Sequence, residues 1–135
     1  MSTFPEPIEV DQYIARPPGA VWAALTTPDG IAAWWAQGDV AAVVGHRFEL
    51  DMPGGGGVPC EVLEVDEPRR FTHTLGDWTI SWTLVAEGAG TRVLVVHSGF
   101  DPGRPQDRFA FDNMGPGWRD EVLPRFARTV EAAAA

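Results

Sequence analysis

The chain has 135 residues, of which 44% are hydrophobic and 21% are charged, so its composition is that of an ordinary globular protein. Ten basic and nineteen acidic residues give a net charge of −9, which would repel the phosphates of a nucleic acid and the surface of an anionic membrane. Chains of this length commonly form one domain, and we expect residues 1–135 to do so.

The first predicted element is a strand from Ile8 to Ile14, where apolar and polar residues alternate with a period of two. Two prolines end this strand, and a short helix is predicted over residues 20–25. A second short helix is expected to begin at Thr27, whose hydroxyl can cap it, and to carry Trp34 and Trp35. The chain is thus predicted to begin with one strand and two short helices.

Four or five short strands are predicted between residues 38 and 99, because turn residues recur at short intervals in this segment. The clearest alternation runs from Trp78 to Leu84, where every second residue is large and apolar. The segment from Cys60 to Val65 is ambiguous. By the same parity rule, one face of this antiparallel meander carries Phe48, Leu50, Met52, Phe71, His73, Leu75, Trp78, Trp82, Val93, Val95 and His97.

Residues 99–115 form a loop that contains several large apolar side chains, and we expect it to fold back as a partial lid. From about residue 116 the pattern becomes that of the longest helix, with Trp118 and Phe126 on its apolar stripe. Pro124 lies inside this helix and is expected to bend it. The apolar residues of the predicted lid are Phe100, Phe109, Phe111 and Met114.

The order of these elements predicts an α+β fold, because the strands are consecutive and the helices are segregated from them. We expect a curved antiparallel sheet wrapped around the long C-terminal helix. Large aromatic side chains must then either fill the space between sheet and helix or line a cavity there.

Several short motifs, taken in order, resemble a known superfamily. They are Val21-Trp22, Trp34-Trp35, Gly45 before Phe48, Gly90-Thr91, the run from His97 to Phe100, and Gly117-Trp118. From about Ile8 to Val130 the chain resembles the START-like SRPBCC superfamily and, within it, homologues of the C-terminal domain of the activator of heat shock protein 90 ATPase. The resemblance implies a helix-grip fold, START-like and Bet v-like, with a cavity between sheet and helix.

Relatives in this superfamily bind lipids, hormones or polyketides in that cavity, so the resemblance implies a ligand-binding protein. Our leading hypothesis is the binding of a small hydrophobic or aromatic molecule, favoured by the apolar and aromatic residues of the inward face. The residues expected to contact this ligand are Trp35, Phe48, Leu50, Met52, Phe71, His73, Trp78, Trp82, His97, Phe100, Met114 and Trp118.

An alternative is a polyketide-cyclase-like or lyase-like enzyme in which His73 or His97 acts as a base. Inward-facing histidines are more often hydrogen-bonded core groups, however. Other groups that could move protons are scarce, because Tyr13 and Arg92 fall on the outward parity of their strands. Binding without catalysis is therefore favoured.

A third hypothesis is a protein-binding module for a chaperone or another protein, through an apolar surface near residues 100–114. The heat shock protein activator works through two domains, and this chain resembles only the C-terminal one. Either a monomer or a homodimer is compatible with the sequence.

No metal site and no cofactor are expected, because the spacing of the histidines is not that of metal ligands. Cys60 is the single cysteine, which excludes an internal disulfide, and we expect it to be a buried, inert thiol. The sequence shows neither a signal peptide nor a run long enough to span a membrane. We therefore expect a cytoplasmic protein without membrane insertion.

Overall fold

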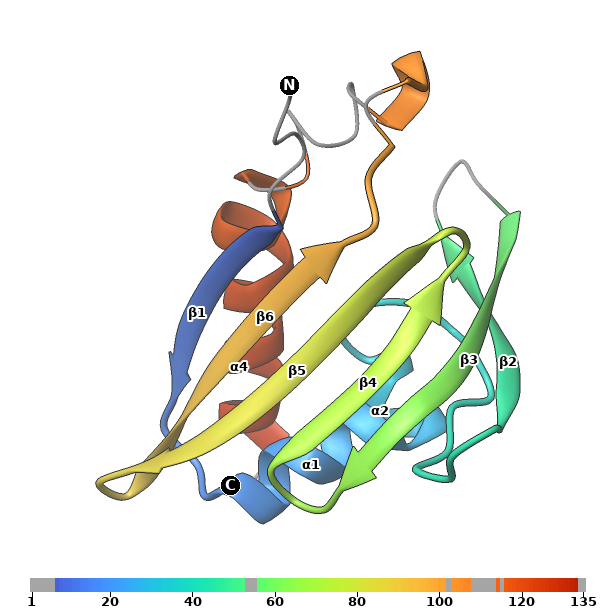
Figure 1. Cartoon of the computed structure of the whole chain (residues 1–135). Helices are drawn as coiled ribbons and strands as arrows, with labels where there is room; N and C mark the ends of the chain where they lie inside the picture. Colours follow the sequence, from blue (N-terminus) through green and yellow to red (C-terminus); the bar gives the residue numbers. More distant parts are fainter. Residues whose placement is uncertain (1–6, 53–55, 102, 108–113, 115, 134–135) are drawn as a thin grey trace.

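The computed structural model describes residues 7–52, 56–101, 103–107, 114 and 116–133. This part of the chain contains one antiparallel sheet of six strands, in the order β1-β6-β5-β4-β3-β2 (Figure 1). The strands β2 to β6 form a meander, and β1 pairs with β6. Their bounds are β1 Ile8–Ile14, β2 Arg47–Met52, β3 Gly56–Asp66, β4 Arg70–Leu75, β5 Trp78–Glu87 and β6 Gly90–Ser98.

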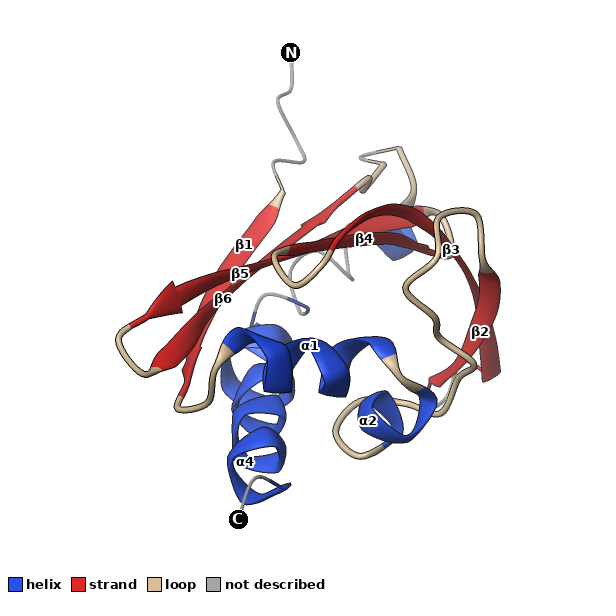
Figure 2. Cartoon of the chain, turned by 90° about the horizontal axis from the view of Figure 1, so that it is seen from below, coloured by secondary structure: helices blue, strands red, loops and turns tan. Residues whose placement is uncertain are grey.

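The helices lie on the concave side of the curved sheet (Figure 2). Two short ones, α1 (Pro18–Thr26) and α2 (Pro28–Ala32), lead from β1 at one edge of the sheet toward β2 at the other. The final helix consists of a π-helical turn, η1 (Trp118–Val122), that continues into α4 (Leu123–Ala133). This arrangement confirms the predicted α+β helix-grip fold. No helix in the described ranges is long and apolar enough to cross a membrane.

The start of α2 follows the prediction, but its end does not. The hydroxyl of Thr27 caps the helix by accepting a hydrogen bond from the N–H of Gly30 at 3.1 Å. The helix ends at Ala32, so Trp34 and Trp35 lie in the turn that follows it. This turn closes because the N–H groups of residues 34, 35 and 36 all donate to the carbonyl of Ile31. It stacks the two tryptophan rings, with centroids 5.7 Å apart.

Five strands follow residue 38 in the described part of the chain, where four or five short ones were predicted, but not all of them are short. β3 has 11 residues and β5 has 10. The ambiguous pattern from Cys60 to Val65 has a structural cause, because the register between β3 and β4 shifts between Val62 and Glu64. Such a bulge interrupts the alternation of side chains on which the parity rule depends.

Aromatic rings fill much of the space between the sheet and the final helix. Trp34 stacks on Phe126 of α4 with ring centroids 3.9 Å apart, and meets Trp82 of β5 edge-on at 5.7 Å. All three side chains are fully buried. Ring pairs of this kind add about 0.5–1.5 kcal/mol each beyond their buried area. The space between the sheet and the final helix is therefore occupied largely by a packed aromatic core.

The helix accommodates Pro124 by widening the turn that precedes it. The N–H of Leu123 donates to the carbonyl of Trp118, five residues back, as in a π-helix. A proline within a regular α-helix would both lack an N–H and press its ring against the carbonyl four residues earlier. The effect of Pro124 is thus a local π-helical turn on its N-terminal side, next to Trp118.

Candidate functional site

A small apolar pocket lies between the end of β2 and the start of the final helix. Its volume is about 170 Å³, and it is lined by Trp35, Met52, Met114, Gly117, Trp118 and Val122. Four of these six residues were predicted to contact a ligand. Gly117 and Val122 were not predicted to do so. Gly117 directly precedes Trp118, and Val122, four positions after it, would share its face on the predicted helix.

The remaining predicted contact residues lie elsewhere in the structure, and none of them is among the residues that line this pocket in the described part of the chain. Trp78 is half-buried. The others are buried in the core: Phe48, Leu50, Phe71, His73, Trp82, His97 and Phe100. Strand parity thus identified the inward face correctly, but it does not separate residues that fill the interior from those that border a space.

Both inward histidines accept hydrogen bonds from tryptophans. The indole N–H of Trp82 donates to Nε2 of His73, and the indole N–H of Trp118 donates to Nδ1 of His97, each at 3.0 Å. Nδ1 of His73 lies 2.9 Å from the carbonyl of Thr74 and, since a carbonyl only accepts, must carry the proton. These partners define the tautomer of each ring.

Burial keeps both histidines neutral. The pKa of His73 is lowered to about 4 because its ring is removed from water. The pKa of His97 is lowered to about 4 by burial and, secondarily, by the charge that a protonated His73 would carry. At neutral pH each ring is an uncharged imidazole whose acceptor nitrogen is occupied by an indole N–H.

Trp118 connects the pocket to the core. Its ring borders the pocket and lies 5.4 Å from that of Trp35, while its N–H is engaged by His97 on β6. Because this polar atom is already bonded, Trp118 offers the pocket essentially an apolar surface. The bond also fixes the orientation of the ring, so this wall of the pocket is formed in advance of any ligand.

The described part of the predicted lid packs against the sheet. The ring of Phe100 lies 4.7 Å from that of His97 and 5.3 Å from that of Trp78. Arg104 forms an ion pair with Asp77 in the turn between β4 and β5, at 2.8 Å. Phe109 and Phe111, which were predicted to belong to the lid, lie outside the described residues.

The single cysteine is buried, as predicted. Burial raises the pKa of the Cys60 thiol to about 12, and the negative charge of Glu49 adds to this effect. The thiol is therefore protonated at neutral pH, and the protonated form is a poor nucleophile.

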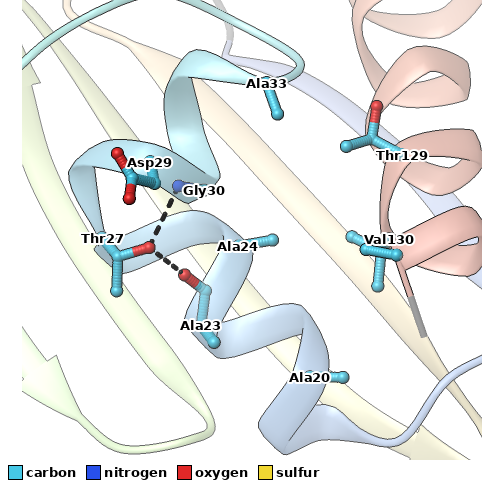
Figure 3. Close-up of a pocket in the computed structure, with 10 residues that line it drawn as sticks. Ala20, Ala23, Ala24, Thr27, Asp29, Gly30, Ala33, Thr129 and Val130 are labelled. Atoms are coloured by element: carbon cyan, nitrogen blue, oxygen red, sulfur yellow. Dashed lines mark hydrogen bonds between the residues drawn. The ribbon is translucent and has the colours of Figure 1, made fainter.

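A second hollow of about 440 Å³ lies between α1, α2 and the end of α4 (Figure 3). The hydroxyl of Thr27 in this groove accepts from Gly30 and donates to the carbonyl of Ala23, so it is already engaged. The lining consists mostly of small side chains and contains no aromatic ring: Ala20, Ala23, Ala24, Thr27, Asp29, Gly30, Ala33, Thr129, Val130 and Ala133. The smaller aromatic pocket is therefore the better candidate site.

In the described ranges, no group of three or more His, Cys, Asp or Glu side chains is placed to hold a metal ion. The candidate site is lined instead by apolar side chains, chiefly tryptophan and methionine.

Comparison with known proteins places these features in a family context. The model of the family described as activator of Hsp90 ATPase homolog 1-like protein matches residues 15–131. Protein MLL2253 from Mesorhizobium loti is 30% identical in sequence and has a similar structure, with a TM-score of 0.78 over 95% of this chain and 96% of that chain. No curated protein matches the sequence.

Two further solved structures are similar. Protein BH1534 from Bacillus halodurans is 30% identical, with a TM-score of 0.82 over 93% of this chain and 96% of that chain. The Aha1 dimer from Colwellia psychrerythraea shares the fold, at 20% identity and a TM-score of 0.75 over 96% of this chain and 98% of that chain.

Proposed function

The chain belongs to the family of activator of Hsp90 ATPase homolog 1-like proteins, and from this we propose that it binds a small hydrophobic or aromatic molecule in the pocket beside Trp118. The observation that carries the proposal is the composition of the lining, which combines two tryptophans, two methionines and a valine around an open volume. Flat rings and adaptable thioethers are surfaces that favour apolar ligands.

The volume of the pocket limits the size of the ligand. Sites for drug-sized molecules usually measure about 300–1,000 Å³, whereas this pocket measures about 170 Å³. A molecule with one or two rings, or a short branched hydrocarbon, would suit it. A lipid or a multi-ring polyketide would require the aromatic core to rearrange.

Filling the pocket by mutation provides the test. A Cβ atom added at Gly117 would have no atom within 4 Å apart from its chain neighbours and the backbone of its own helix, and the residue has ordinary helical backbone angles. Gly117→Leu should therefore occupy the pocket without straining the fold. Gly19 in α1 has the same free space and lies outside the pocket, so Gly19→Leu is the matched control.

We would titrate the wild type and both variants with α-methylstyrene, following tryptophan fluorescence and the thermal midpoint. The wild type and Gly19→Leu should be quenched and stabilised, and Gly117→Leu should not respond. Failure of the wild type to respond, or an equal response in all three proteins, would count against the proposal.

The enzyme alternative gains no support from the histidines. A general base needs a free lone pair, and the acceptor nitrogens of His73 and His97 already receive hydrogen bonds from Trp82 and Trp118. Their lowered pKa values also make them weak bases at neutral pH. We therefore propose binding and not catalysis.

Protein partners form the second part of the proposal. The predicted apolar surface near residues 100–114 is not seen at Phe100, which is buried, and Met114 borders the pocket.

Aha1 from Colwellia psychrerythraea is a dimer, and we propose that this chain is either monomeric or homodimeric in a reducing cytoplasm. Native mass spectrometry measures the oligomeric state and would also detect a co-purified ligand.

A further inference from the structure

Two buried N–H groups near the candidate site have no hydrogen-bond partner among the described residues. They are Nε1 of Trp78 and Nε2 of His97. The large majority of buried side-chain polar atoms in proteins are hydrogen-bonded, so an unpaired donor calls for an explanation. Two of them in adjacent side chains, whose ring centroids are 5.1 Å apart, point to a missing acceptor.

The protonation of His97 follows from its other nitrogen. Nδ1 accepts the hydrogen bond of Trp118, so the proton of the neutral ring must be on Nε2. The side chain is fully buried, so bulk water does not reach it. The indole of Trp78 can only donate. Both groups therefore require an acceptor, and neither can satisfy the other.

The surroundings define the acceptor as uncharged. Phe100 lies against both rings, and Trp118 closes the far side of His97. Burying a carboxylate or phosphate among aromatic rings would cost more than two neutral donors return. A carbonyl oxygen has two lone pairs, carries no net charge and can accept from two donors at once.

We propose that Trp78 and His97 donate hydrogen bonds to the carbonyl oxygen of the ligand, and that the protein therefore prefers small apolar carbonyl compounds to hydrocarbons of the same shape. This inference rests on the proposed function, because the apolar part of the ligand occupies the pocket. Trp118 joins the two regions, since its ring borders the pocket and its N–H is bonded to His97. Neither Trp78 nor His97 lines the pocket, so the rings beside Trp118 must shift for the carbonyl of the ligand to reach the two donors.

A pair of matched probes tests the inference. Acetophenone and α-methylstyrene have the same shape, and differ in that a C=O group replaces a C=CH₂ group. Without donors, the carbonyl would lose its hydrogen bonds to water and bind more weakly. With the two donors, acetophenone should bind about fivefold more tightly or better.

Nuclear magnetic resonance of ¹⁵N-labelled protein at neutral pH observes the donors directly. Acetophenone should move the side-chain N–H signals of Trp78 and His97 downfield, and α-methylstyrene should not. The indole N–H groups of Trp34 and Trp82 already have partners and serve as internal references. Trp78→Phe removes one donor and should lower the ratio of the two affinities, whereas Trp22→Phe, at a core position, should keep it.

The outcomes separate the inference from the proposed function. If α-methylstyrene binds as tightly as acetophenone, the pocket is real but the carbonyl preference is wrong. Unshifted Trp78 and His97 signals under saturating acetophenone would mean that the donors serve a buried water, and would also overturn the inference. If neither probe binds, the proposed function itself fails.

Discussion

The indole N–H of Trp82 donates to Nε2 of His73 across 3.0 Å at a position where neither side chain is more than 1% exposed. The two residues lie on the neighbouring strands β4 and β5, on the same face of the sheet. Trp118 and His97 repeat the arrangement between the final helix and β6. Burial thus keeps two imidazoles neutral inside an aromatic core, and each accepts a hydrogen bond from an indole of the same core.

The pair formed by His73 and Trp82 should show energetic coupling. His73→Leu leaves the indole N–H unpaired, and Trp82→Phe leaves the imidazole acceptor unpaired, each at a cost of about 1–3 kcal/mol in addition to lost packing. The double variant removes both polar groups, so it should be less destabilised than the sum by about 1 kcal/mol or more. Urea unfolding of the four proteins measures this coupling. Strict additivity would mean that the bond contributes nothing.

Stability should fall when the pH drops from 7 to 5. The pKa values of His73 and His97 are lowered to about 4, whereas a free histidine titrates near 6.5, so the unfolded chain binds more protons in this window. The stability they confer is complete above about pH 6.5 and is lost progressively below it. We expect a loss on the order of 2–4 kcal/mol at pH 5.

Urea unfolding at both pH values measures this loss. The double variant lacking His73 and Trp82 is the control, and its dependence on pH should be shallower. An identical dependence in the two proteins would show that other groups are responsible.

Trp118→Phe should destabilise the protein more than Trp35→Phe. Both residues border the pocket, but only the indole N–H of Trp118 is bonded to a buried imidazole in the described structure. Removing it leaves Nδ1 of His97 without a donor, which costs about 1–3 kcal/mol. Trp35→Phe loses ring area only. Thermal and urea unfolding of the two variants would give equal losses if the hydrogen bond had no role.

Cys60 should be unreactive in the folded protein. Since its pKa is raised to about 12, the thiolate population at pH 8 is about a thousandfold below that of an ordinary thiol. Ellman's reagent should therefore modify the native protein very slowly and the protein in concentrated urea at once. Rapid modification under native conditions would indicate that the pairing of β2 with β3 around Cys60 opens frequently.

Strand parity was enough to predict much of the fold. It placed Leu50, His73 and Trp82 on the inward face, because side chains alternate strictly in a regular strand. It failed where the register shifts, between Val62 and Glu64. The end of α2 was also missed, since three N–H groups converge on one carbonyl there and no residue type marks this event.

The candidate site was only partly predictable, for a different reason. Parity says which face a side chain occupies, but not which side chain it meets. The partners Trp118 and His97 are 21 residues apart in the chain, and their bond depends on how the final helix lies on the sheet. Pro124 indicated a disturbed helix, but not that a wider turn would form before it and position Trp118.

The π-helical turn divides the final helix into two segments of different rotational phase. In α4, Leu123, Phe126 and Val130 face the core, while Trp118 and Val122 upstream border the pocket. If the same residues formed a regular α-helix, Trp118 would lie about 100° further around the axis, away from His97. The core-facing segment would stay in register. The end of the helix that borders the pocket can therefore be re-aimed independently of the part that holds the fold together.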